Sequence, residues 1–151
     1  ELETQTDMNM LLSVLAALVS VIHSLPYGCQ PGWSSIEGKC YKLFTERRTW
    51  IDQSFYCAYA GGKLATAKDD RENALIREIA QGTPVFIGGN SFGSGWTWSD
   101  GSAFGYYGNW ANPDDATPPP RKPCVRTDES GQWVAVCCDI EEQAAVCVKH
   151  W

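Results

Sequence analysis

The chain contains seven cysteines, and all of them follow one apolar run near the N-terminus. Cysteines in this number persist as disulfides only in an oxidising compartment, because cytosolic reductants keep thiols reduced. Disulfides between distant positions restrict the fold more than any other feature of this sequence. The odd count also means that one cysteine is left over. The seven are Cys29, Cys40, Cys57, Cys124, Cys137, Cys138 and Cys147.

The apolar run extends from Met10 to Ile22, and the segment HSLPYG follows it. The run has the length of a signal-peptide hydrophobic region and is too short to span a bilayer comfortably. We therefore predict a signal peptide over residues 10–27 and a secreted, extracellular protein, with a buried core helix as the alternative. Residues 1–9 are then upstream translated or non-native residues, because the chain begins with Glu1 and two nearby methionines are candidate starts.

Charge separates this leader from the rest of the chain. The net charge is −6, from 12 basic and 18 acidic residues. Residues 1–26 hold three of the acidic residues and no Lys or Arg, so the remainder carries a net charge of −3. Its basic residues form no stripe, and we therefore expect no nucleic-acid partner. No later segment is apolar enough to cross a membrane. The remaining length of about 125 residues suits one domain, which we place at residues 28–151.

The patterns in this domain predict a mixture of helices and short strands. Thr49 and Asp69 are candidate N-caps of two helices, over residues 49–62 and 69–82, and glycines end both helices. A small hairpin closed by Cys29 and Cys40 is expected before the first helix. Short apolar or alternating runs predict the strands. These cover residues 38–44, 63–66, 85–89, 124–127, 132–138 and 144–150.

A segment without regular periodicity runs from Ser99 to Pro123. It is too long for a simple connection in a compact domain, so it is either a functional loop or a disordered one. Its aromatic side chains either stack on a ligand or pack inside the loop, whereas nearby tryptophans are expected in the core. The loop aromatics are Tyr106, Tyr107 and Trp110, and the expected core tryptophans are Trp96, Trp98 and Trp133.

The order of these features resembles the C-type lectin-like domain. A cysteine pair at a hairpin precedes a helix that carries Cys57, and then come a second helix, FIGG, WTWSDG, a long loop and the last cysteines. The similarity covers residues 29–150. It implies an α+β, C-type lectin-like fold with two helices, small antiparallel sheets and a long loop, stapled by disulfides. The implied pairs are Cys29–Cys40, Cys57–Cys147 and Cys124–Cys138.

The two adjacent cysteines leave a choice for the partner of Cys124. In this family the loop cysteine usually falls five residues after a tryptophan, which favours Cys138, five residues after Trp133. Three interpretations of the spare Cys137 stay open. It is a buried inert thiol, a competitor of Cys138, or a disulfide link between two chains in a dimer.

In sugar-binding members of this family the long loop holds a calcium ion, which takes about six to eight oxygen ligands. The resemblance places Asn112, Asp114 and the following Asp115 at the family's Glu-Pro-Asn or Gln-Pro-Asp triplet. The residues just before Cys124 and just after Trp133 offer no carboxylate. Asn112 and Asp114 are therefore candidate metal ligands of a degenerate site that is expected to bind calcium poorly, with ordinary turn chemistry as the alternative.

We predict that the protein recognises carbohydrate through its long loop, so its partners are glycans or glycoproteins. The alternative is a calcium-independent module that uses the same fold to bind a protein or mineral surface. No Ser-His-Asp arrangement and no histidine-rich metal spacing occur, so an enzyme is not expected. The candidate ligand-binding residues are Tyr107, Trp110, Asn112, Asp114 and Asp115.

Overall fold

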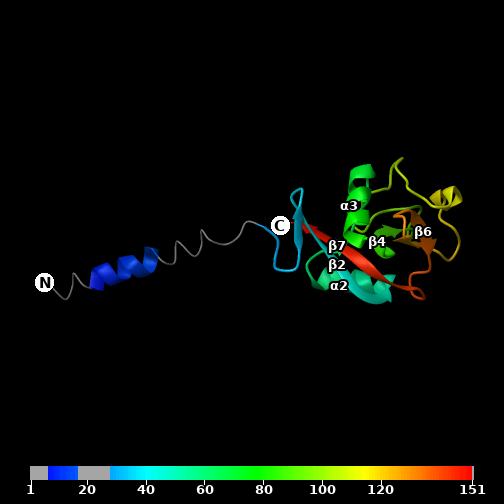
Figure 1. The fold of residues 1–151 in the computed structure, drawn as a ribbon. Coiled ribbons are helices and arrows are strands. Elements are labelled where there is room, and N and C mark those ends of the chain that lie inside the picture. Colours follow the sequence, from blue (N-terminus) through cyan, green and yellow to red (C-terminus); the bar gives the residue numbers. More distant parts are fainter. Residues whose placement is uncertain (1–6, 17–27, 151) are drawn as a thin grey trace.

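The computed structural model describes residues 7–16 and 28–150 (Figure 1). Residues 7–16 are helical, and their side chains are exposed. Residues 17–27 lie outside the described residues, so most of the predicted signal peptide is not described and the signal peptide stays a prediction. Neither described segment contains a helix that is both long and apolar enough to cross a membrane.

Residues 28–150 form one mixed α+β domain. Its helices are α2 (Trp50–Tyr59), α3 (Asp70–Ala80) and the 3-10 helix η1 (Pro113–Ala116). Its strands are β1 (Ser34–Ile36), β2 (Lys39–Thr49), β3 (Lys63–Leu64), β4 (Val85–Asn90), β5 (Cys124–Thr127), β6 (Trp133–Val136) and β7 (Glu142–His150).

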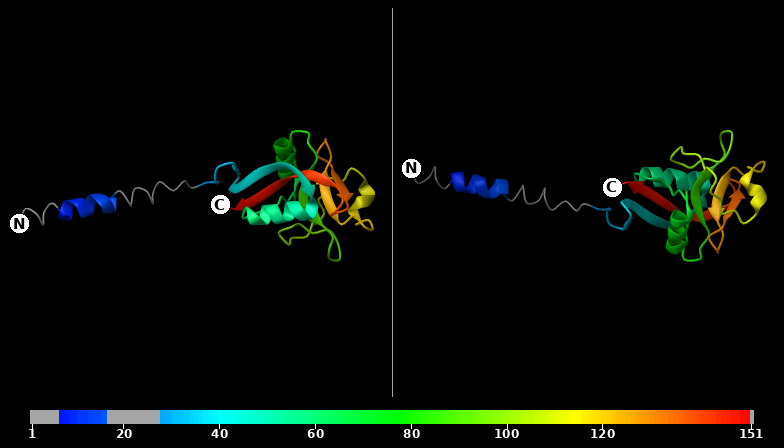
Figure 2. Two further views of the ribbon diagram at one scale, coloured as in Figure 1. Left: turned by 90° about the horizontal axis from the view of Figure 1, so that it is seen from below. Right: turned by 90° about the horizontal axis from the view of Figure 1, so that it is seen from above.

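The strands form a single sheet in the order β1-β2-β7-β4-β5-β6, and β3 pairs with β7. Neighbouring strands are antiparallel, except that β4 and β7 run parallel. This parallel pair joins the small antiparallel sheets that were expected into one. Figures 1 and 2 show α2 and α3 on opposite faces of the β2–β7 ladder, so both faces of the sheet are covered. The predicted α+β fold class is confirmed.

The core is divided between the two faces of the sheet. Val85 and Ile87 of β4 pack with Ile76 of α3, whereas Phe86 packs with Cys57 of α2. Successive side chains of a strand point to opposite faces, which explains this division. A helix covers each face, and a strand buried on both sides needs apolar residues at consecutive positions. This explains the continuous apolar run at residues 85–89, in the segment that forms β4.

Helix α2 begins at its predicted cap. The hydroxyl oxygen of Thr49 accepts a hydrogen bond from the main-chain N–H of Asp52 at 3.2 Å. The chain turns away after the helix at Gly61, which has a φ of +85°. The buried face contains Gln53, which the apolar pattern did not predict. Its Nε2 donates to two main-chain carbonyls, so the amide is satisfied inside the core.

Helix α3 is fixed at its start by two carboxylates. The predicted cap Asp69 accepts a hydrogen bond from the N–H of Glu72 at 2.8 Å. Oε2 of Glu72 accepts from the N–H of Lys68 at 2.8 Å and from the hydroxyl of Thr66 at 3.0 Å. These bonds tie the helix to the segment that follows β3. The helix ends at Ala80, and its C-cap Gln81 has a left-handed backbone.

Three disulfides join elements that are distant in the sequence. Cys57–Cys147 connects α2 to β7 across a separation of 90 residues. Cys124–Cys138 connects the start of β5 to the segment after β6, at the base of the long loop. Cys29–Cys40 ties the segment before β1 to the start of β2. These are the three pairs that the resemblance implies.

The Cys57–Cys147 disulfide should contribute most to stability, because the entropy of the unfolded chain falls more when a longer loop is closed. We expect the variant Cys57→Ala/Cys147→Ala to lose about 2–5 kcal/mol of unfolding free energy in urea denaturation. The matched control is Cys29→Ala/Cys40→Ala, which opens a loop with a separation of only 11 residues. A loss no larger than that of the control would contradict the expectation.

Candidate functional site

The long loop leaves the sheet after Asn90, at the end of β4, and returns at Cys124, at the start of β5. Asn90 and Thr97 exchange two main-chain hydrogen bonds of 2.8 Å, and Thr97 also bridges to Ala103. Helix η1 lies in the second half of the loop. The segment without periodicity therefore has a defined conformation and is a built part of the domain.

Six aromatic side chains join this loop to the core, and we call them the aromatic cluster. Trp133 of β6 is 0% exposed and lies at its centre. Four other rings meet Trp133 edge-on with centroid separations of 5.5–5.6 Å. Each such pair contributes about 0.5–1.5 kcal/mol beyond the burial of its area. The cluster consists of Trp96, Trp98, Phe104, Tyr107, Trp110 and Trp133.

The three tryptophans that were expected in the core are buried, which confirms that prediction. Trp110 is half-buried, and its ring lies 5.0 Å from that of Trp96. Main-chain bonds hold its segment against β6. The N–H of Ala111 donates to the carbonyl of Trp133 at 2.9 Å, and the N–H of Trp133 donates to the carbonyl of Asn109 at 2.8 Å. Trp110 thus packs inside the loop and keeps part of its ring exposed.

The adjacent tyrosines Tyr106 and Tyr107 lie in different environments. Tyr107 is half-buried, and its hydroxyl donates to Oδ1 of Asp70 in α3 at 2.9 Å. Burial, together with this hydrogen bond to a carboxylate, raises the pKa of Tyr107 above its ordinary value. Tyr106 is fully exposed. One tyrosine therefore fixes the loop to α3, and the other presents its ring to solvent.

A cleft of about 390 Å³ opens over the exposed edge of the aromatic cluster, and we call it the loop cleft. This volume lies within the range of about 300–1,000 Å³ that is typical of ligand pockets. Glycines line part of it, so the rings are not covered. At Gly108 an added Cβ would lie 3.1 Å from Cδ1 of Trp110, too close for a side chain without moving the ring. The larger lining residues are Trp96, Phe104, Tyr106, Tyr107, Trp110 and Pro118.

The Asn-Pro-Asp triplet forms the start of η1. Asn112 is the N-cap, and its Oδ1 accepts from the N–H of Asp114 at 3.2 Å, with Pro113 at the first position of the helix. Asp115 faces the body of the domain. Its carboxylate accepts a hydrogen bond from the main-chain N–H of Ala135 at 3.4 Å. Its main-chain carbonyl accepts a hydrogen bond from the indole N–H of Trp96 at 2.8 Å. In this structure the triplet acts as a helix cap.

The oxygen atoms of this triplet do not form the calcium site that the resemblance implies. Oδ1 of Asn112 and one carboxylate oxygen of Asp115 already accept hydrogen bonds, and Asp114 is exposed. The segments around Cys124 and after Trp133 add no carboxylate. Across residues 7–16 and 28–150, no three His, Cys, Asp or Glu side chains are grouped so that they could hold a metal ion. Calcium takes about six to eight oxygens, and the described triplet offers far fewer.

Cys137 has no disulfide partner within the described residues, because Cys124 pairs with Cys138. Its side chain is half-buried. The thiol donates to the carbonyl of Arg121 at 3.0 Å. The choice between the two adjacent cysteines therefore falls on Cys138, and the Cys137 thiol is partly accessible beside the end of the long loop.

Sequence patterns missed two residues that support the site. Phe104 stacks on Trp98 with a centroid separation of 4.0 Å, but it lies in a glycine-rich stretch that has no periodicity. Asn73 of α3 accepts from the indole N–H of Trp133 at 2.8 Å. A polar residue three positions before Ile76, on the buried face of a helix, was the available signal for Asn73. These contacts position Trp133 and hence the loop.

Comparison with known proteins agrees with this fold. Residues 46–149 match the family described as Lectin C-type domain. The chain is 30% identical over 145 residues to the lactose-binding lectin l-2 of Anguilla japonica. This alignment covers 85% of the present chain and 86% of that relative.

Solved structures share the architecture over most of the chain. The carbohydrate-recognition domain of the mouse scavenger receptor C-type lectin has a TM-score of 0.69 at 28% identity, covering 81% of this chain and 96% of that chain. A calcium-independent type II antifreeze protein has a TM-score of 0.69 at 26% identity, covering 81% and 94%. The disulfide framework, the long loop and these similarities lead to one conclusion: the chain belongs to the C-type lectin domain family.

Proposed function

We propose that this protein is a secreted binding domain that recognises carbohydrate through the loop cleft without a calcium ion held in the family's manner. The observation that carries the proposal is the cleft itself. Three aromatic rings of its wall, those of Phe104, Tyr107 and Trp110, pack on Trp133. Part of the Trp110 side chain and all of Tyr106 remain exposed. Rigid, partly exposed aromatic rings offer contact area at a low cost in conformational entropy.

The chemistry of the cleft suits a sugar ring. A pyranose has one face rich in C–H groups, which packs on an aromatic ring, and hydroxyls around its edge that need polar partners. Helix η1 adjoins the cleft, because its residue Ala116 lines it; Asp114 is exposed on this helix, and Asn112 caps it. In this proposal Tyr107 and Trp110 form the stacking wall, and Asn112 and Asp114 supply polar contacts from η1. Asp115 supports this helix from behind, through its hydrogen bonds with Ala135 and Trp96.

The relatives support this proposal because they are described as proteins that bind carbohydrate. A 30% identical relative is a lactose-binding lectin, and one structural neighbour is a carbohydrate-recognition domain. The three disulfides and the apolar run near the N-terminus support secretion, because disulfides persist in oxidising compartments. An enzymatic activity is not part of the proposal.

A second candidate function follows from the missing oxygen ligands for calcium. A calcium-independent type II antifreeze protein has the same fold at 26% identity. A protein or mineral surface could therefore be the ligand, and the exposed Tyr106 would then contact that surface. If a glycan array gives no signal and the domain adsorbs to a mineral or ice surface, this second function replaces the first.

Calcium should not stabilise the domain. We expect the melting temperature to stay unchanged when millimolar calcium replaces a chelator, because the described triplet offers too few oxygens and two of them already accept hydrogen bonds. Scanning calorimetry of the wild type and of Asp114→Ala checks this expectation. A rise of several degrees with calcium that disappears in Asp114→Ala would show that a metal site forms.

Binding of a glycan selected from an array, in the presence of chelator, should depend on Tyr106. We expect Tyr106→Ala to weaken binding by roughly two- to tenfold, the equivalent of one aromatic contact. Its melting temperature should not change, because this ring is fully exposed. The matched control is Tyr59→Ala, which removes a 94% exposed tyrosine from α2. Equal binding by both variants would show that Tyr106 does not contact the glycan.

Cys137 gives the domain a route to a disulfide-linked dimer, which would carry two loop clefts and gain avidity for a multivalent glycan. The thiol is half-buried beside Arg121, near the end of the long loop. In non-reducing electrophoresis we expect a band at twice the chain mass for the wild type and a single monomer band for Cys137→Ser. A monomer band for both proteins would rule out the dimer.

A further inference from the structure

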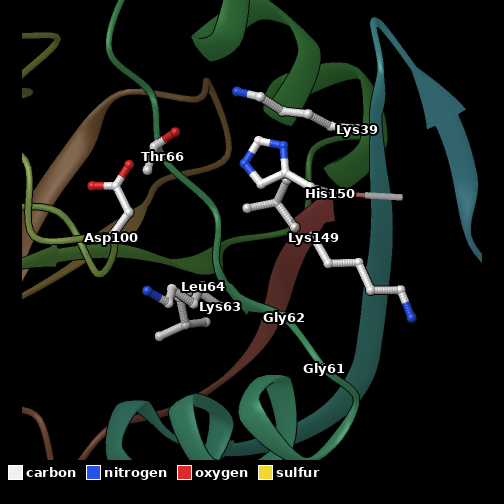
Figure 3. Close-up of a pocket in the computed structure, with 10 residues that line it drawn as sticks. Lys39, Gly61, Gly62, Lys63, Leu64, Thr66, Asp100, Lys149 and His150 are labelled. Atoms are coloured by element: carbon white, nitrogen blue, oxygen red, sulfur yellow. The ribbon is translucent and has the colours of Figure 1, made fainter.

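A second cavity, of about 320 Å³, lies where the ends of β2, β3 and β7 meet (Figure 3). We call it the strand-end groove. Figure 1 places this end of β7 on the side of the domain opposite η1, so the groove is separate from the loop cleft. The side chains that line it and carry its chemistry are Lys39, Lys63, Thr66, Asp100, Val148 and His150.

The register of the strands brings these residues together from three parts of the sequence. Lys39 pairs with His150, and Lys63 pairs with Val148. Residues opposite each other in an antiparallel pair share a face, and so do positions two apart in one strand. These four side chains therefore lie on one face of the sheet. Figure 3 shows the His150 ring beside Lys39, while the Lys149 side chain points away from both Asp100 and Thr66.

Two glycines keep this groove open. Gly61 and Gly62 form its rim where the chain passes from α2 to β3. A Cβ at Gly62 would lie 2.6 Å from the carbonyl oxygen of Val148, so the close approach of the two backbones requires glycine. No side chain therefore rises from this rim, and the groove stays open to solvent there.

The charges of the groove are positive on balance. Asp100 pairs with Lys68 at 2.6 Å, and Glu72 pairs with Lys39 at 3.2 Å. Burial alone would raise the pKa of Asp100, but hydrogen bonds from Lys68 and Ser102 outweigh it and lower this pKa to about 2. Both carboxylates are thus matched by lysines.

Further positive charge remains in and behind the groove. No ion pair to Lys63 occurs among the described residues, and Lys149 contacts only uncharged oxygens and the Trp33 ring. Residues 27–151 carry a net charge of −3, so this local excess opposes the sign of the domain. Positive charge concentrated in a cavity favours an anionic ligand.

We propose that the strand-end groove binds an anionic saccharide, in which a sulfate or carboxylate group on the sugar is held by Lys63. The volume is near the lower end of the range of about 300–1,000 Å³ for ligand pockets, which suits one or two sugar rings. Val148 supplies an apolar wall for the ring. A long nucleic acid is disfavoured, because the rest of the negatively charged domain would repel its phosphates. This site goes beyond the proposed loop cleft and does not depend on it.

Three saccharides with one core separate the sources of the negative charge: lactose, 3′-sulfated lactose and 3′-sialyl-lactose. In calorimetric titrations of the full chain with chelator, we expect both anionic sugars to bind at least about tenfold more tightly than lactose, the usual gain from one charge-assisted contact. The gain should shrink as the salt concentration rises. If only one anionic sugar gains affinity, the group on that sugar is the one recognised. Equal affinity for all three sugars would overturn the proposal.

Variants locate the site. Lys63→Glu should abolish the higher affinity for the anionic sugars over lactose, and Lys63→Arg should keep most of this gain in affinity. Lys63 is exposed, so folding should be unaffected, and melting curves check this. The matched control Lys122→Glu makes the same charge change on the long loop and should leave the gain intact. Tyr106→Ala should also leave this gain in affinity intact. The proposal for the strand-end groove can therefore fail independently of the proposal for the loop cleft.

Two further results would count against the proposal. If Lys63→Glu retains the gain, the anion binds elsewhere. If a single-stranded tetranucleotide binds as tightly as the sulfated sugar and competes with it, the groove is a general anion site and not a saccharide site.

Discussion

The packing of the long loop against Trp133 determines the shape of the candidate binding face. Trp133 is held from α3 by Asn73 and from the loop by main-chain bonds on both sides of Trp110. The Cys124–Cys138 disulfide closes the base of the same loop. The loop therefore has its conformation from apolar packing, backbone hydrogen bonds and one covalent link, all of which are independent of a metal ion. A calcium ion is not needed to explain why this loop has a defined structure.

This arrangement changes what the fold can use for recognition. The resemblance implied oxygen ligands for a calcium ion in the long loop, but here the corresponding oxygens cap η1 or bond to β6. The exposed edge of the aromatic cluster, which lines the loop cleft, is the contact surface that we propose. The opposite end of the domain carries a different chemistry, because the ends of three strands place lysines in one groove. One rigid sheet thus positions two candidate sites, one aromatic and one cationic.

Local features of the structure could be predicted from the sequence, and features that depend on long-range register could not. The caps at Thr49 and Asp69 and the buried run of β4 are set by nearby residues, so their patterns were sufficient. The disulfide pairs came from the resemblance. Buried Gln53 was missed because its partners are main-chain carbonyls that only tertiary packing supplies. The strand-end groove was missed for a similar reason, since Lys39, Lys63 and His150 meet only through strand pairing.

The central claim is that packing, and not calcium, holds the long loop. Amide hydrogen exchange of Ala111 and Trp133, whose N–H groups bond the loop to β6, tests it most directly. Exchange should be compared in excess calcium and in excess chelator, at the same pH and temperature. We predict that both amides are protected to the same degree in the two conditions. Protection that appears only with calcium would contradict the account, because it would show that a metal ion orders the loop.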